Sequence, residues 1–160
     1  MARRTIRPVR ASQVEMTELV LPNDTNRLGN LLGGRLMHWI DIAAAIAAAR
    51  HTNRVCVTAS VDELRFLNPV KQGEVVVLRA SVNRVFRTSL EVGVKVTTEN
   101  TLTGDSRHTN TAYLTFVAID DDGRPVFASP VRPVTAAEKR RFRDAARRRQ
   151  TRLLHRRHPS

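Results

Sequence analysis

The sequence predicts an α+β fold in which one long central helix is wrapped by an antiparallel sheet of about five strands. The first observation is the stretch 35–51, which is rich in strong helix formers and apolar on nearly every side, with six alanines among residues 43–49. A helix that is apolar all round is buried, and alanines let a sheet wrap closely around it. The second observation is a series of β-branched segments with short connections, which indicates antiparallel neighbours.

The other elements follow from local patterns along the chain. A first strand is expected at 12–21, and residues 22–26 have the composition of a turn. After the helix, β-branched residues predict four strands, at 55–66, 74–85, 89–98 and 107–119. Thr135 with Glu138 at the third helical position predicts a helix N-cap, and the basic helix that begins there runs to about Leu154.

The chain has 160 residues, a length that predicts one domain. We expect a flexible basic N-terminus at residues 1–11, the wrapped-helix domain at 12–133, and a basic C-terminal helix and tail at 134–160. No apolar run reaches the roughly 18 residues that a membrane span needs, and the basic start lacks the apolar stretch of a secretory signal. The single cysteine, Cys56, excludes an internal disulfide. These points favour a cytoplasmic protein.

The net charge of +12 is concentrated near the C-terminus. Residues 138–158 contain ten Lys or Arg and two acids, so they hold two thirds of the excess charge. Such a tail could attract a polyanion, a membrane surface or an anionic substrate. The alternative is a solvated helix face.

Asp41 is the one carboxylate between Gly33 and Arg50, within an otherwise apolar helix. An unpaired buried charge costs several kcal/mol, so this residue needs an explanation. One interpretation is structural, with Asp41 paired with Arg35 or His38 or facing a water-filled interface. The other is a general base or a nucleophile in a semi-apolar cleft. His38 shares the helix face of Asp41 and could act directly or simply be packed.

The pair Gly33-Gly34 stands at the start of the predicted helix. Free backbone N–H groups and the positive dipole end at such a start can form an oxyanion hole, although Gly-Gly pairs are also common in turns. Gly33 and Asp41 are eight residues apart, or about 12 Å of helix. One substrate carbonyl cannot contact both within one helix. We therefore predict a composite site across a two-fold dimer interface.

Other site classes are not predicted. The histidines show no metal-ligand spacing, and no serine lies in a G-x-S-x-G context. The glycines at 29–34 fit neither a Walker loop nor a dinucleotide fingerprint.

Four stretches in the same order resemble the acyl-CoA hydrolases of the hotdog superfamily, above all the YciA-type and brain acyl-CoA hydrolase group. They are Pro22–Asp41, Val57–Val70, Arg84–Val92 and Tyr113–Asp120. The resemblance covers about residues 12–150. It implies a hotdog fold and hydrolysis of an acyl-CoA thioester to a free acid and CoA. It also implies a homo-oligomer, commonly a trimer of dimers, with no cofactor apart from the CoA of substrate and product.

The resemblance also assigns roles to particular residues. Asp41 matches the catalytic carboxylate, Asn30 matches a loop asparagine that serves the site, and the backbone near Gly34 would stabilise the oxyanion. The CoA-contacting positions implied are Gly33, Thr58, Ser60, Arg65, Arg84, Arg87, Thr88 and Ser89. The guanidiniums and hydroxyls of residues 84–89 suit phosphates, although each arginine could also be a solvated strand end. Phe86 stands where relatives often carry glycine.

Two mechanisms and two other functions remain compatible with the sequence. Asp41 could activate a water or attack the thioester directly to form an anhydride. A non-catalytic acyl-CoA-binding hotdog protein would use the same CoA contacts. Nucleic-acid binding through the basic tail is less favoured, because Phe142 is the only aromatic residue there for base stacking.

Overall fold

The computed structural model describes residues 5–158. Its elements, in chain order, are β1 (Arg7–Pro8), the 3-10 helix η1 (Val9–Ser12), β2 (Val14–Leu19), the 3-10 helix η2 (Pro22–Asp24), α1 (Gly33–Thr52), β3 (Val55–Val61), β4 (Val75–Val85), β5 (Ser89–Glu99), β6 (Ser106–Ile119), β7 (Val131–Arg132) and α2 (Ala136–Arg157).

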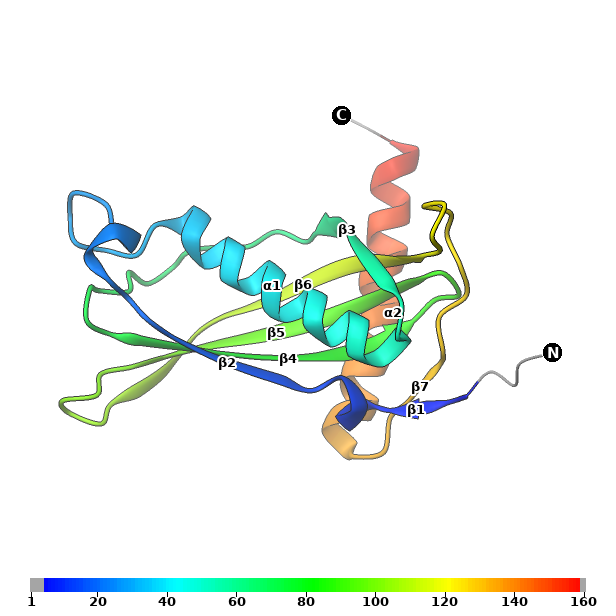
Figure 1. Cartoon of the computed structure of the whole chain (residues 1–160), viewed down its shortest axis with the longest axis horizontal. Coiled ribbons are helices and arrows are strands. Elements are labelled where there is room, and N and C mark those ends of the chain that lie inside the picture. Colours follow the sequence, from blue (N-terminus) through cyan, green and yellow to red (C-terminus); the bar gives the residue numbers. More distant parts are fainter. Residues whose placement is uncertain (1–4, 159–160) are drawn as a thin grey trace.

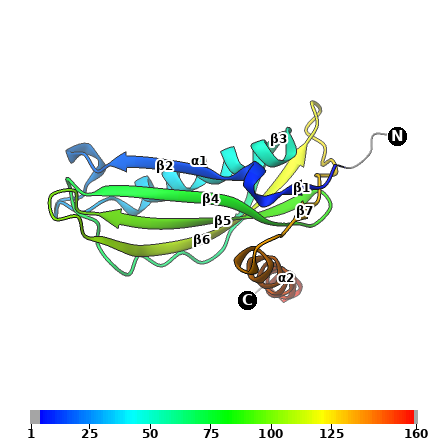
Figure 2. The same cartoon turned by 90° about the horizontal axis from the view of Figure 1, so that it is seen from below.

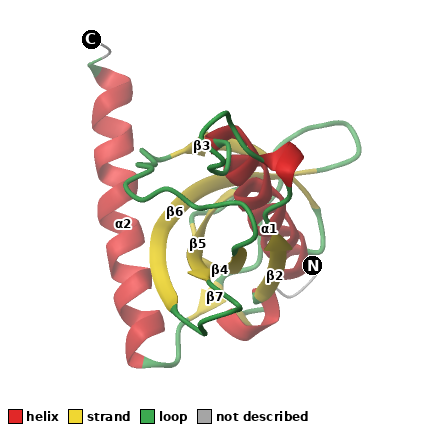
Figure 3. Cartoon of the chain, turned by 90° about the vertical axis from the view of Figure 1, so that its left-hand side faces the viewer, coloured by secondary structure: helices red, strands yellow, loops and turns green. Residues whose placement is uncertain are grey.

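Five antiparallel strands form one curled sheet in the order β2-β4-β5-β6-β3. The sheet curves around α1, which lies on its concave side, and α2 crosses the convex side (Figure 3). The inward positions of the three central strands alternate as a half-buried pleat requires, and they supply the core together with α1. The predicted α+β hotdog fold, with its long helix, five strands and C-terminal helix, is confirmed.

The helix α1 is buried on one side only. Its core face consists of Leu36, Trp39, Ile40, Ala43, Ala44, Ala47 and Ala48. The opposite face is uncovered within the protomer, where His38 is exposed and Asp41 is half-buried. The sequence predicted burial all round, because the helix is apolar on nearly every side. The curled sheet is a half-barrel, so it encloses only part of the helix.

The segment before β2 is folded onto the body. β1 pairs with β7 in a parallel register, and Val9 is buried. The Ser12 hydroxyl, also buried, accepts from the Val82 backbone N–H at 2.9 Å. This contrasts with the flexible N-terminus expected for residues 1–11, of which residues 1–4 lie outside the described residues.

The two edges of the sheet differ in character. β2 forms one edge and β3 the other, so β3 pairs with β6 on one side and leaves its second side free in the protomer. Three valines of β3 are exposed, Val55 by 66%, Val57 by 44% and Val61 by 40%. Free strand edges with apolar side chains are sites of pairing with another chain.

The helix α2 begins with the predicted N-cap. Thr135 accepts from the Glu138 N–H at 3.1 Å, and the Glu138 carboxylate accepts in return from the Thr135 N–H. The helix lies against the convex face near one end of the sheet (Figure 2), and its C-terminal part extends past the strands (Figure 1). Among the described residues, neither helix is both long and apolar enough to cross a membrane.

Candidate active site

Asp41 lies on the uncovered face of α1, next to the edge strand β3. The Thr58 hydroxyl of β3 donates to Asp41 Oδ1 at 2.7 Å. Arg35, a partner considered from the sequence, is instead 3.2 Å from Asp24. In residues 5–158, no cation forms an ion pair with Asp41. The carboxylate is therefore oriented by a hydroxyl and not neutralised by a salt bridge, as a general base or nucleophile requires.

The start of α1 presents two uncommitted backbone donors. Leu32 precedes the helix and supplies no side-chain cap, while the Arg35 N–H is bonded to the Leu32 carbonyl at 3.1 Å. Within the described part of the chain, the N–H groups of Gly33 and Gly34 have no acceptor. A Cβ at Gly34 would meet no atom within 4 Å, so open space lies beside it. This is the arrangement of an oxyanion hole.

The loop before the helix is organised by Asn26. Its Oδ1 accepts from the N–H groups of Leu28 at 2.9 Å and Asn30 at 3.2 Å, and Gly29 adopts the left-handed φ of +75° that this turn needs. Because two amides hold Oδ1, the orientation of the Asn26 amide is fixed. Its Nδ2 has no acceptor among residues 5–158. The sequence singled out Asn30, whose side chain likewise has no hydrogen bond there.

The predicted site residues fall into three groups in one protomer. The first comprises Asn30, Gly33 and Gly34 at the start of α1. The Phe66 ring lies beside Gly33, since a Cβ built on that glycine would be 3.4 Å from it. Arg65, adjacent to Phe66, pairs with Glu63 at 3.0 Å. The second group is Asp41 with Thr58 and the half-buried Ser60 of β3. Eight residues, or about 12 Å of helix, separate Gly33 from Asp41, so one protomer does not bring these two groups together.

The third group, Arg84, Arg87, Thr88 and Ser89, lies at the connection of β4 and β5. Arg84 packs over the Phe142 ring of α2 at 3.9 Å and donates to the Phe142 carbonyl at 3.2 Å. Its guanidinium is thus committed to holding α2. Arg87 is exposed and lies 5.3 Å over the ring of Phe127.

Phe86 and Arg87 form part of the turn between β4 and β5. Arg87 adopts a positive φ of +88°. Phe86 stacks beneath Arg149 of α2, at 4.5 Å. The ring therefore helps to fix α2 on the sheet, and the strained backbone position is borne by an arginine.

A buried ionic network beneath α2 was not predicted from the sequence. Glu91 of β5 is fully buried and accepts from Arg148 at 2.7 Å, and Arg152 lies 3.4 Å from the same carboxylate. Arg152 also bonds Asp62, which follows β3, at 3.0 Å. Burial and the bond to Glu91 act in opposite directions on Arg148, and the bond prevails and raises its pKa. Glu91 at an outward position of β5, together with an arginine-rich helix later in the chain, was the available signal.

The curled five-stranded sheet and the long helix on its concave side define a hotdog-fold protein. Residues 28–104 match the thioesterase superfamily. The uncharacterized acyl-CoA thioester hydrolase YkhA of Bacillus subtilis is 46% identical over 127 residues, 79% of this chain and 74% of the relative. The chain belongs to the thioesterase superfamily, within its acyl-CoA thioester hydrolases.

Other similarities agree with this family. Acyl-coenzyme A thioesterase 11 of Mus musculus is 40% identical over 90% of this chain, which spans 24% of that longer relative. A hexameric acyl-CoA thioesterase, solved in its apo form, superposes with a TM-score of 0.91 at 39% identity, covering 94% of this chain and 97% of the other. An acyl-CoA hydrolase from Staphylococcus aureus, solved with butyryl-CoA and CoA, gives 0.89 at 34% identity, covering 95% and 93%.

Proposed function

We propose that this acyl-CoA hydrolase uses Asp41 as its catalytic carboxylate, in a site completed by the α1 start of a second protomer. The observation that carries the proposal is the Asp41–Thr58 hydrogen bond at the protomer edge, with no cation on the carboxylate in residues 5–158. A carboxylate that accepts one hydroxyl and is otherwise free can take a proton from water or attack a thioester.

The second protomer is supported by two uncovered surfaces that adjoin. The free edge of β3 carries exposed valines, and the uncovered face of α1 carries Asp41 beside it. A two-fold axis at this edge pairs β3 with its symmetry mate and continues the sheet through both protomers. The two α1 helices then run antiparallel side by side, so that each helix start lies near the Asp41 of the other.

These groups account for the main steps of the reaction. Water adds to the thioester carbonyl, its proton passes to Asp41, and the tetrahedral oxyanion accepts from the N–H groups of Gly33 and Gly34. The carbon–sulfur bond then breaks, and the departing thiolate takes up the proton held by Asp41, which gives a carboxylic acid and the CoA thiol and restores the carboxylate. Direct attack by Asp41 to form an anhydride, followed by hydrolysis, gives the same products. CoA leaves as a good thiolate leaving group, so neither route demands a strong general acid.

A further donor for this site is Asn26. Solved variants of the Staphylococcus aureus hydrolase replace an aspartate, an asparagine fifteen residues before it and a threonine seventeen residues after it. Counted from Asp41, the same spacings lead to Asn26 and Thr58. The fixed amide of Asn26, with its Nδ2 unused in the described residues, suits donation to the substrate carbonyl or to the attacking water. Asn30 remains the alternative.

The CoA phosphates and the assembly are proposed from the same considerations. Arg87, with Thr88 and Ser89, offers the exposed guanidinium and hydroxyls at the β4–β5 turn. Arg65 and Ser60 are further candidate contacts. The hexameric neighbours favour a trimer of dimers, with the dimer as the smallest active unit.

Thiol release from a panel of acyl-CoAs tests the catalytic role of Asp41. Asp41→Asn keeps the size of the side chain and its bond to Thr58 but removes the base. We expect kcat to fall at least about a hundredfold, with KM little changed. Unchanged turnover in this variant would remove Asp41 from the mechanism.

Complementation tests the composite site. Asn26→Asp retains an acceptor for the loop amides but removes the Nδ2 donor, and we expect it to lower kcat by about a hundredfold. When this variant and Asp41→Asn are unfolded together and refolded, half of the dimers are hybrids with one intact site in two. About a quarter of the wild-type turnover should return. No recovery means that both residues act within one chain, and a larger loss in Asn30→Ala than in Asn26→Asp assigns the donor to Asn30.

A further inference from the structure

A groove with a volume of about 870 Å³ lies on the convex face of the sheet, between its outer surface and the first half of α2. It is bounded by β2, β4, β5 and β6 on one side and by residues 140–148 on the other. Asp41 and α1 lie on the concave side, so the sheet separates this groove from the proposed active site (Figure 3). The catalytic mechanism makes no use of it.

The groove carries an excess of positive charge. Five cationic side chains line it, and the two acids that do so are each paired with a cation. Glu15 lies 3.5 Å from Arg79, and Asp144 is paired with Arg147. The remaining exposed cations are Lys95, Arg140 and Arg141, and within residues 5–158 none of these three has an ionic partner.

On the α2 side of the groove, the guanidinium of Arg148 is held in place by its neighbours. Arg148 donates through Nε and Nη2 to the buried carboxylate of Glu91, and its plane lies 3.6 Å over the ring of Tyr113. The side chain is 23% exposed, and Nη1 has no acceptor in the described part of the chain. An arginine held on three sides loses little conformational entropy when it donates to a ligand.

Gly93 leaves room for the side chain of Asn83 beside the Glu91 carboxylate. A Cβ there would lie 2.8 Å from the Nδ2 of Asn83, which is itself 97% buried and bonded to Glu91 at 3.0 Å. The hydroxyl residues Ser81 and Thr111 add further polar groups to the lining. The groove therefore combines a fixed donor, hydroxyls and three uncommitted cations in one concavity.

We propose that this groove binds an anion with at least two phosphate charges, of which pyrophosphate is the simplest. Guanidinium groups bind phosphate oxygens through paired, charge-assisted hydrogen bonds, and three arginines of α2 line one side of the groove while Lys95 of β5 lines the other. A neutral or cationic ligand would leave the three free cations uncompensated. The site is independent of the proposed catalytic function, since it shares no residue with it.

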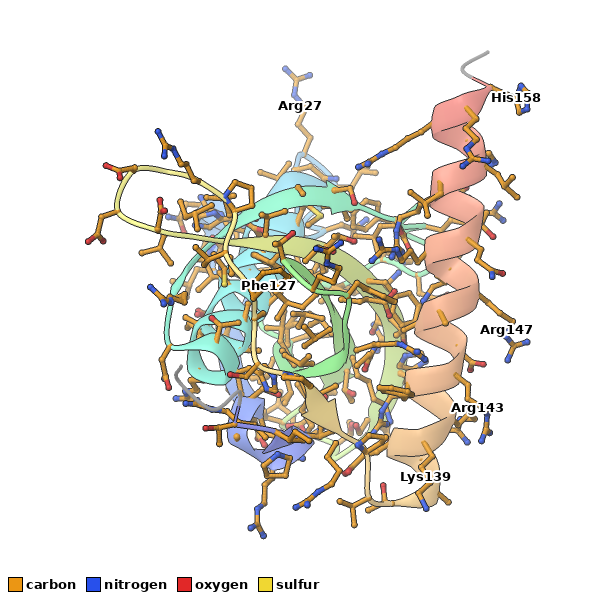
Figure 4. The ribbon with its side chains drawn as sticks, turned by 90° about the vertical axis from the view of Figure 1, so that its right-hand side faces the viewer. Arg27, Phe127, Lys139, Arg143, Arg147 and His158 are labelled. Atoms are coloured by element: carbon orange, nitrogen blue, oxygen red, sulfur yellow. The ribbon has the colours of Figure 1, made fainter. Side chains whose placement is uncertain are left out.

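Calorimetry with pyrophosphate at low ionic strength, on the full chain, tests the proposal. Wild-type protein should bind pyrophosphate saturably at one site per protomer. The pair Arg140→Gln and Arg141→Gln should weaken binding about tenfold or more, and Lys95→Gln should weaken it further. The matched control is the pair Lys139→Gln and Arg143→Gln, which removes the same charge from the same helix. Neither control residue lines the groove, and Arg143 projects away from the sheet (Figure 4).

The outcomes distinguish a specific binding site in the groove from nonspecific electrostatic attraction to a basic helix. Binding that persists in the control pair and is lost in the groove pair supports the site. Equal losses in both pairs, or no saturable binding by the wild type, overturn it. Circular dichroism of each variant checks the fold, and all the substituted side chains are exposed. Because turnover is not measured, failure here leaves the hydrolase assignment unaffected.

Discussion

Replacing Arg148 by methionine would leave the Glu91 carboxylate buried without its main partner. Glu91 is 0% exposed, and Arg148 provides its shortest contact, at 2.7 Å. Removing one member of a buried ion pair costs about 3–5 kcal/mol, because the other charge stays desolvated. Asn83 at 3.0 Å and Arg152 at 3.4 Å still contact the carboxylate, so we place the expected loss near the lower end, at about 3 kcal/mol.

Urea unfolding at a fixed protein concentration measures this loss, since dissociation of an oligomer adds to the apparent stability. The control is Arg147→Met, at the neighbouring position, where the side chain is 76% exposed and its ion pair with Asp144 lies at the surface. That change should stay within about 0.5 kcal/mol. The double variant of Glu91→Gln and Arg148→Met should cost less than the sum of the two single changes. The reasoning is refuted by a loss below about 1 kcal/mol in Arg148→Met, or by additive costs.

Two further predictions concern the site and the core. Thr58→Val removes the hydroxyl that orients Asp41 and should lower kcat by about ten- to a hundredfold in a thiol-release assay. The control, Thr101→Val in an exposed turn, should leave kcat unchanged. If Thr58→Val turned over substrate as fast as the wild type, the hydroxyl would have no role in catalysis. Burial lowers the pKa of His51 below its ordinary 6.5, despite the bond to the Ser129 carbonyl, which raises it. The unfolded chain therefore takes up a proton as the pH falls through 6.5 while the folded chain resists, so the free energy of unfolding should fall below that pH by up to about 1.4 kcal/mol per pH unit. The same titration of His51→Gln should show a shallower slope, and an identical slope contradicts the assignment.

The sequence predicted those helices and strands whose residue types follow a regular pattern along the chain. Alternating and β-branched residues predicted four of the five sheet strands to within a few positions. The strand predicted at 55–66 ends earlier in the structure, where β3 stops at Val61. The helix cap at Thr135 was also recognised, because a capping box is a local pattern. In contrast, the pairing of β1 with β7 joins two-residue strands more than a hundred residues apart, and no periodic signal marks such a contact.

In the candidate site, too, some residues could be found from the sequence, whereas their contacts could be found only from the fold. A lone carboxylate in an apolar helix is visible in sequence, and Asp41 was found on that basis. The bond from Thr58 depends on how β3 packs beside α1, which requires the fold. The commitment of Arg84 to Phe142 is likewise a contact between β4 and the far end of the chain. Charge and residue type suggest what an arginine can bind, but only the tertiary neighbours decide whether it is available.

The edge strand β3 links the assembly of this protein to its chemistry. Its hydroxyl at Thr58 orients Asp41, its free edge is the surface proposed for the second protomer, and Asp62 just beyond it is held by Arg152 of α2. In a separated protomer, β3 keeps hydrogen-bonded neighbours on one side only, and exposed edges open more readily than central strands. Dissociation would therefore remove the partner's oxyanion donors and loosen the hydroxyl that orients the base. Specific activity should accordingly fall as the protein is diluted below its dimer dissociation constant, and activity independent of dilution through that range would contradict a composite site.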